Sequence, residues 1–149
     1  MFDLYLSSSA LEKARTHFSA QARSGLEGIG LLIGDVFSWK GRKYAVAEEY
    51  LTGGNKASSV AAKFDERAFG ALAQVLAKKF PGKIFVGWAH SHPNYGCFLS
   101  QQDVATQENY FPEEWHVAFV VDPVRKEEKA FKLRDGKVVE ASYAVVKKK

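Results

Sequence analysis

The chain has 149 residues, a length that suits a single compact domain with its own hydrophobic core. Hydrophobic residues make up 46% and charged residues 26%, which is ordinary for a globular protein, and no stretch approaches the roughly 20 apolar residues that span a bilayer. The net charge of +4 includes three lysines at positions 147–149, and no basic stripe interleaved with aromatics indicates nucleic-acid binding.

Targeting and redox features agree on one expected location. The N-terminus lacks the basic region and long apolar run of a signal peptide. The single cysteine, Cys97, excludes an internal disulfide, so a reducing, cytoplasmic setting is expected. Residues 1–149 are expected to form one domain, with the lysine-rich segment 147–149 as a solvated tail.

The first third of the chain predicts a strand, a helix and a hairpin. Residues 2–6 alternate enough for a short strand. Ser9 and Glu12 form a capping-box signature before apolar residues at helical spacing, which predicts a helix over 9–23. The apolar run after Glu27 then predicts the first strand of a long hairpin, whose second strand ends at Leu51.

The remainder alternates helices and strands, which predicts an α/β (α+β) domain with a mixed sheet and helices on its faces. The strand ending at His92 is nearly all apolar before its end, as expected of a buried central strand. The later elements are expected in this order: a loop over 52–62, a helix from Phe64 to the turn at 81–82, a strand over 83–92, a loop over 93–99, a helix over 101–110, a strand over 115–121, and a final hairpin of 130–133 with 137–146.

The segment from Trp88 to Asp103 carries the chemistry. Alternate residues of a strand face the same side, so His90 and His92 project together, with Cα atoms roughly 6.6 Å apart. Two neutral imidazoles at that spacing can reach one metal ion, whereas Ser91 points the other way. Two buried, hydrogen-bonded histidines are the alternative.

Asp103 is the candidate third ligand. It lies in the first turn of the helix that follows the loop, where Ser100 is also a candidate N-cap. Two histidines and one carboxylate would leave a fourth position for water, as in a catalytic zinc site rather than a closed structural one. A simple helix cap with an acid in its first turn is the alternative, and both descriptions can hold at once.

Glu27 stands where a hydrophobic strand begins, with Gly28 after it. An exposed carboxylate at a strand end is the simpler interpretation. Beside a metal it becomes a candidate base, because a metal hydrolase needs a group that takes a proton from water and returns it to the leaving amine.

These positions together resemble the motif of the JAMM (MPN-plus, or JAB) metalloproteases. That motif is an upstream Glu, then His-x-His, seven residues, and Ser-x-x-Asp, which here matches Glu27, His90, His92, Ser100 and Asp103. The sequences around the histidines and Ser100 look like those of the proteasome-lid and signalosome members, and Val117 to Pro123 is similar to the strand that follows in them. The resemblance covers roughly residues 24–133.

The resemblance implies a three-layer MPN/JAB fold with a curved mixed sheet, related to that of cytidine deaminases. It implies Zn²⁺ held by His90, His92 and Asp103, with Glu27 as base and acid and Ser100 stabilising the tetrahedral intermediate. It also implies cleavage after the C-terminal glycine of ubiquitin or a ubiquitin-like modifier, with conjugates of these as partners.

The substrate region is less closely matched. The compact form looks like prokaryotic members, and Asn94 stands where the proteasome and signalosome forms usually carry glycine. Residues Asn94, Tyr95, Gly96, Cys97 and Phe98 are expected to bind the substrate tail and, with the loop over 52–62, to flank its channel. Packing within the loop is the alternative for Cys97.

Two other functions share features with this one. A peptidase acting on a sulfur-carrier ubiquitin-like protein in cysteine or cofactor biosynthesis would use the same site residues. A non-catalytic MPN scaffold is the alternative of a different class, and such scaffolds characteristically lack a ligand or the glutamate.

Overall fold

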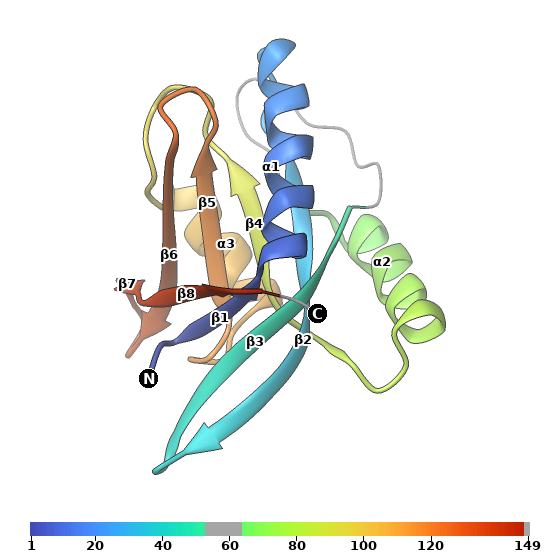
Figure 1. Cartoon of the computed structure of the whole chain (residues 1–149), viewed down its shortest axis with the longest axis vertical. Helices are drawn as coiled ribbons and strands as arrows, with labels where there is room; N and C mark the ends of the chain where they lie inside the picture. The colour runs from blue at the N-terminus through green and yellow to red at the C-terminus, as the bar shows by residue number, and fades with distance from the viewer. Residues whose placement is uncertain (53–63, 148–149) are drawn as a thin grey trace.

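The computed structural model describes residues 1–52 and 64–147, and within them eight strands form one mixed sheet with helices on both faces (Figure 1). The strand order is β7-β6-β5-β4-β2-β3-β1-β8. The elements in chain order are β1 (Leu4–Ser7), α1 (Ser8–Arg23), β2 (Ile29–Trp39), β3 (Arg42–Leu51), α2 (Glu66–Lys79), β4 (Ile84–Ser91), α3 (Gln101–Tyr110), β5 (Val117–Asp122), β6 (Glu127–Arg134), β7 (Lys137–Ala141) and β8 (Tyr143–Val146).

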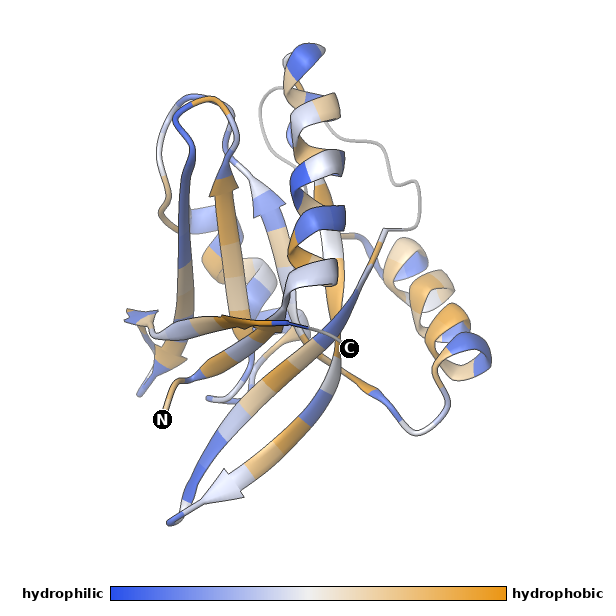
Figure 2. Cartoon of the chain, in the orientation of Figure 1, coloured by the Kyte–Doolittle hydropathy of each residue, from blue (hydrophilic) through white to orange (hydrophobic). Residues whose placement is uncertain are grey.

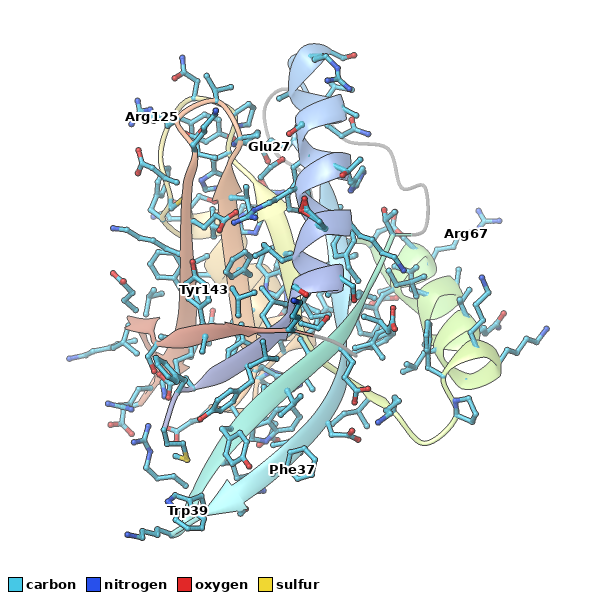
Figure 3. The ribbon with its side chains drawn as sticks, viewed as in Figure 1. Glu27, Phe37, Trp39, Arg67, Arg125 and Tyr143 are labelled. Atoms are coloured by element: carbon cyan, nitrogen blue, oxygen red, sulfur yellow. The ribbon has the colours of Figure 1, made fainter. Side chains whose placement is uncertain are left out.

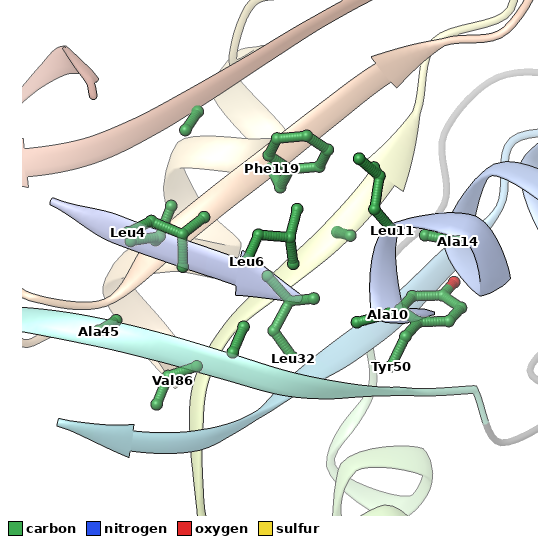
Figure 4. Close-up of a cluster of buried hydrophobic side chains, with 14 of the residues drawn as sticks. Leu4, Leu6, Ala10, Leu11, Ala14, Leu32, Ala45, Tyr50, Val86 and Phe119 are labelled. Carbon is green, nitrogen blue, oxygen red and sulfur yellow. The ribbon is translucent and has the colours of Figure 1, made fainter. Parts of the chain in front are cut away.

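The layers follow from two hydrophobic clusters on opposite faces of the sheet, which confirms the predicted fold class. The residues of α1 pack on one face in the cluster of Figure 4, and α2 and the end of α3 pack on the other. The first cluster includes Leu6, Leu11, Phe18, Leu32 and Phe119, and the second includes Ile29, Phe64, Leu72, Trp88 and Phe111.

The strand that carries the histidines lies at the centre, as the sequence predicts. β4 pairs with β5 in parallel and with β2 antiparallel, and its neighbour β5 is hydrophobic along most of its length (Figure 2). A Cβ at Gly87 would lie 2.0 Å from the carbonyl oxygen of Val117, so glycine is required where these strands approach closely. Burial on both faces explains the continuous apolar pattern of this strand.

The first helix begins one residue before the predicted range, at Ser8, and its N-cap lies two residues before the serine of the capping signature. Ser7, not Ser9, is the N-cap, and its hydroxyl oxygen accepts from the backbone N–H of Ala10 at 3.1 Å. The reason is tertiary: β1 remains extended through Ser7, whose hydroxyl also donates to the carbonyl oxygen of Glu48 on β3 at 2.8 Å.

The predicted final hairpin is wrong in its second strand. Of the residues predicted for that strand, those in β7 pair with β6, whereas those in β8 pair in parallel with β1 at the other edge of the sheet. Because Ser142 alone separates β7 from β8, the two edges of the sheet must lie next to each other. The sheet is therefore curled strongly enough to bring its edges together, which agrees with the expected curvature.

Asp3 stabilises this closure of the sheet, in which its two edges meet. Its carboxylate accepts from the backbone N–H of Ser142 at 2.9 Å, from the ammonium of Lys132 at 2.7 Å and from Arg42 at 3.1 Å. Burial favours the neutral acid, but the hydrogen bonds from Lys132 and Ser142 outweigh it and lower the pKa of Asp3. The closure thus depends on an ionised carboxylate that is largely shielded from water.

None of the helices in the described part of the chain is both long enough and apolar enough to cross a membrane.

We expect Asp3→Ala to lower the free energy of unfolding by about 3 kcal/mol, because it leaves the buried ammonium of Lys132 without its partner. Urea unfolding followed by circular dichroism measures this loss. Lys13→Ala is the control, since it breaks only an exposed pair with Glu49 and should cost less than about 0.5 kcal/mol. Equal stability of the two variants would contradict the role of Asp3.

Candidate metal centre

The end of β4 holds two imidazoles in one buried position. His90 is the penultimate residue of the strand and His92 follows its last residue, and both are at most 2% exposed. Their side chains lie on the same face, with Nε2 atoms 3.1 Å apart. The backbone N–H of His92 donates to the carbonyl oxygen of Val121 at 2.9 Å, so β5 fixes where the chain leaves the strand.

Asp103 reaches the same point from the first turn of α3. Ser100 and Asp103 form a reciprocal capping box: the Ser100 hydroxyl accepts from the Asp103 backbone N–H at 3.1 Å, and Asp103 Oδ2 accepts from the Ser100 backbone N–H at 2.9 Å. That same Oδ2 lies 3.1 Å from His90 Nε2 and 3.2 Å from His92 Nε2. The helix cap therefore also aims the carboxylate, as the sequence predicts.

The three atoms fit a divalent metal ion. Donors bound at 2.0–2.2 Å around a tetrahedral zinc lie about 3.4 Å from one another, close to the observed separations of 3.1–3.2 Å. The donor set of two imidazole nitrogens and one carboxylate oxygen is the only group of this kind among the described residues. It could hold a metal through three protein atoms and leave a fourth position for water.

The two histidines are held by different means. His92 Nδ1 lies 3.0 Å from the carbonyl oxygen of Gly96; a carbonyl only accepts, so Nδ1 carries the proton and Nε2 has a free lone pair. His90 is stacked on Trp88, with ring centroids 4.3 Å apart and planes inclined by 10°. Trp88 in turn donates to Gln107, whereas His90 Nδ1 has no hydrogen-bond partner within the described residues.

Electrostatics favour the protonation states that a metal requires. Burial lowers the pKa of His90, although the neighbouring Asp103 carboxylate opposes this, so the imidazole is neutral at pH 7. Burial also disfavours the charged form of Asp103, but the His90 imidazole and the backbone N–H of Ser100 outweigh it and lower the pKa of Asp103. The site therefore combines a neutral nitrogen donor with an anionic oxygen donor.

Glu27 lies beside these residues. Ile29 pairs with His90 across β2 and β4, and the backbone N–H of Ser91 donates to the carbonyl oxygen of Gly28 at 3.0 Å. Continuing this register places Glu27 opposite His92, on the face that the two histidines share. Glu27 is 3% exposed, so the simpler interpretation of an exposed strand end is wrong (Figure 3).

The loop between β4 and α3 places two aromatic rings against His92. Tyr95 stacks on the imidazole with a centroid distance of 4.7 Å, and Phe98 lies 4.8 Å away at a steeper angle. These rings remain 38% and 44% exposed, so they contact a metal-ligand candidate on one side and solvent on the other. They form an apolar border between His92 and solvent.

Asn94 is compatible with a backbone position that favours glycine. Its φ is +70°, in the left-handed region where asparagine is the best tolerated residue after glycine. The departure from the glycine of similar proteins thus preserves the backbone. The loop has a second such position at Gly96, whose φ is +88°.

The thiol of Cys97 points toward the sheet, where Sγ lies 3.4 Å from the carbonyl oxygen of Val120. Burial raises the pKa of Cys97 to about 11, so the thiol is protonated at neutral pH. This geometry favours packing in the loop over nucleophilic reactivity.

The second segment expected to flank the channel, the loop over 52–62, lies outside the described residues apart from Thr52. The sequence-based interpretation also missed Asp122, which directly follows the predicted strand over 115–121. Asp122 is 0% exposed and binds the loop that surrounds His92. Its position directly after an all-apolar strand was the only available signal.

Comparisons with known proteins extend over most of the chain. Residues 3–113 match the family described as JAB1/Mov34/MPN/PAD-1 ubiquitin protease. The chain is 34% identical over 141 residues to COP9 signalosome complex subunit 5 of Candida albicans, and 30% identical over 147 residues to 26S proteasome non-ATPase regulatory subunit 14 of Dictyostelium discoideum. These alignments cover 90% and 97% of this chain but only 21% and 44% of those relatives.

A solved structure supports the fold independently. The solution structure of protein DSY2949 from Desulfitobacterium hafniense superimposes with a TM-score of 0.72 at 17% identity, covering 97% of this chain and 94% of the other. At this identity the likeness shows a shared fold and no more.

We expect the purified chain to bind about one equivalent of zinc and Asp103→Asn to bind at least ten-fold more weakly, because an amide oxygen lacks the charge of the carboxylate. Inductively coupled plasma mass spectrometry, covering zinc and iron, identifies the metal, and competition with a chromogenic chelator measures affinity. Glu108→Gln removes an exposed acid of the same helix and serves as the control. Undiminished binding by Asp103→Asn would remove this carboxylate from the site.

Proposed function

The chain belongs to the JAB1/Mov34/MPN/PAD-1 family, and on this premise we propose that it is a zinc-dependent hydrolase of peptide or isopeptide bonds. It cleaves after the C-terminal glycine of ubiquitin or a ubiquitin-like modifier, and conjugates of such a modifier are its partners. The chain spans less than half the length of the two curated relatives compared above, so activity and partners are proposed for this chain on its own residues.

One observation carries the proposal: three donor atoms, two from the end of β4 and one from the first turn of α3, lie within 3.1–3.2 Å of one another, beside a buried glutamate. A helix cap and a buried pair of histidines would each explain one contact. They do not explain why an open tetrahedral donor set forms next to Glu27. A hydrolytic metal site accounts for all of them together.

The position of each site residue indicates its role in the proposed reaction. Bound zinc would lower the pKa of a coordinated water and polarise the scissile carbonyl group. His90, His92 and Asp103 would hold the ion, and Glu27, on the same face, would take the proton of the attacking water. The Glu27 carboxyl group then gives that proton to the departing lysine amine as the carbon–nitrogen bond breaks.

Ser100 would act on the oxygen of the same carbonyl group. Its hydroxyl oxygen already accepts from the Asp103 backbone N–H at 3.1 Å, which leaves the hydroxyl hydrogen free to donate. That hydrogen would stabilise the negative charge that develops on the carbonyl oxygen. The cap thus fixes both the ligand Asp103 and a donor for the reaction.

The substrate tail would enter along the loop Asn94–Phe98. The exposed faces of Tyr95 and Phe98 offer an apolar border next to His92, and an extended tail ending in glycine is narrow enough to lie along these rings. Asn94 and Gly96 shape the loop backbone, and the Cys97 thiol contacts β5 at the carbonyl oxygen of Val120. We expect residues of the substrate tail to contact these two rings.

A panel of ubiquitin-like fusions, incubated with and without a chelator, tests the function directly. Cleavage after the terminal glycine that stops on chelation and returns with zinc is the expected result. A zinc-loaded chain that cleaves no member of a panel including sulfur-carrier fusions would favour the scaffold function instead.

We expect Glu27→Gln to keep zinc and fold while hydrolysis falls by about 10²–10⁴-fold, because the amide cannot accept the proton of water. Initial rates on a cleaved fusion, with zinc content and thermal melting measured in parallel, check this. Glu66→Gln on α2 is the matched control and should leave the rate unchanged. Turnover retained by Glu27→Gln would exclude this residue as the base.

Ser100→Ala should lower kcat by about 10²–10³-fold through loss of the donor. It should also cost about 1 kcal/mol of stability through loss of the N-cap. Ser100→Thr keeps both a hydroxyl and a cap, so it should restore most of the rate. If Ser100→Ala lost stability but kept its kcat, the hydroxyl would have a structural role only.

A further inference from the structure

The buried carboxylate of Asp122 has no part in the mechanism above, yet it organises the loop around His92. It lies at the end of β5, is 0% exposed, and accepts four backbone N–H groups. Two belong to its own turn, from Val124 and Arg125, both at 3.0 Å from Oδ1. The other two belong to the loop after β4, from Asn94 at 2.9 Å and Gly96 at 2.8 Å.

The loop contacts explain why this position suits a carboxylate. Asn94 and Gly96 are the two loop residues with positive φ, and this backbone turns both N–H groups toward the same acceptor. A carboxylate accepts at both oxygens and donates nothing, so it satisfies all four N–H groups at once. Oδ1 accepts from Asn94, Val124 and Arg125, and Oδ2 accepts from Gly96. An asparagine would therefore point its amide hydrogens either at the three N–H groups around Oδ1 or at the N–H of Gly96.

Asp122 is connected to the His92 ring through one residue, Gly96. Asp122 Oδ2 holds the N–H of Gly96, and the carbonyl oxygen of the same residue holds His92 Nδ1 at 3.0 Å. The residue before Asp122 holds the main chain of His92, because the carbonyl oxygen of Val121 accepts the His92 N–H at 2.9 Å. The end of β5 thus fixes both the backbone and the ring of His92.

We propose that Asp122 is a positioning residue for the metal centre: through Gly96 it keeps the proton of His92 on Nδ1 and directs Nε2 toward the ion. The inference rests on the proposed function, since it concerns a ligand of that site. The ring of His90 is stacked on Trp88 and has no comparable hydrogen bond at Nδ1 within the described residues, so the rings of His90 and His92 are oriented by different contacts. The guanidinium group of Arg125 also lies near this carboxylate, with Nε 3.7 Å from Asp122 Oδ2. Arg125 and Glu27 lie at the same end of the molecule (Figure 3).

The first measurement is zinc affinity of the whole chain. We expect Asp122→Asn to raise the zinc dissociation constant by about ten-fold, at the lower end of the range for groups that orient a ligand. Asp3→Asn is the matched control, because it also alters a hydrogen-bonded, largely shielded carboxylate but near the N-terminus, and should change affinity by less than about two-fold. Affinity unchanged in Asp122→Asn, or lowered equally in both variants, would overturn the proposal.

The second measurement separates positioning from simple destabilisation. In nitrogen-15 NMR spectra of the zinc-loaded protein, His92 should show a protonated Nδ1 whose hydrogen exchanges slowly with water. Asp122→Asn should speed that exchange by about ten-fold, whereas Asp3→Asn should not, even if both variants melt earlier. A His92 ring protonated on Nε2 in the unaltered protein would overturn the proposal outright.

The third measurement tests the route through the loop and covers the case in which Asp122→Asn does not fold. Gly96→Ala strains a residue at φ +88°, so it should weaken zinc binding by disturbing the same carbonyl group. If Asp122 acts through Gly96, the losses in zinc affinity of the two single variants should not multiply in the double variant. Multiplying losses, or normal zinc affinity in Gly96→Ala, would contradict this route. Because zinc affinity and NMR are the readouts, a chain that binds zinc but cleaves nothing would defeat the proposed function alone.

Discussion

The hydrogen-bonded end of β4 is the constraint on which the candidate site depends. At this point β2 and β5 pair with the strand from both sides, so the backbone around His90 and His92 has little freedom. The pairing with β2 brings Glu27 opposite His92, and the pairing with β5 brings Val121 and Asp122 beside it. Each partner strand thus delivers a different functional group to the same pair of imidazoles.

The site is also stabilised by the way its charges are buried. A carboxylate shielded from water costs free energy unless it is hydrogen-bonded or paired. Asp103 meets this requirement with the Ser100 N–H and the His90 imidazole, and Asp122 meets it with four backbone N–H groups. The first arrangement creates a donor set that could hold a metal ion, and the second holds the loop beside it, so the same physical rule applies to both carboxylates.

The closure of the sheet lies apart from this chemistry. Asp3, Lys132 and Ser142 join the two sheet edges near the N-terminus, whereas Glu27 lies at the end of the molecule where β4 terminates (Figures 1 and 3). Stability of the curled sheet and geometry of the site can therefore be altered separately. This separation is what makes changes at Asp3 useful controls for changes near His92.

The sequence by itself determined the elements and the donor set, because both depend on short-range patterns. His90 and His92 share a face through strand alternation, and Ser100 orients Asp103 through a cap within one helical turn. The central strand was likewise readable from its apolar run. Tertiary structure decided whatever depends on distant partners: the role of Asp122, the burial of Glu27, Ser7 as the cap of α1, and the crossing of β8 to the opposite edge. Local patterns contain no information on which remote backbone groups a buried carboxylate will meet or which free edge a last strand will join, because those choices are made by packing of the whole chain.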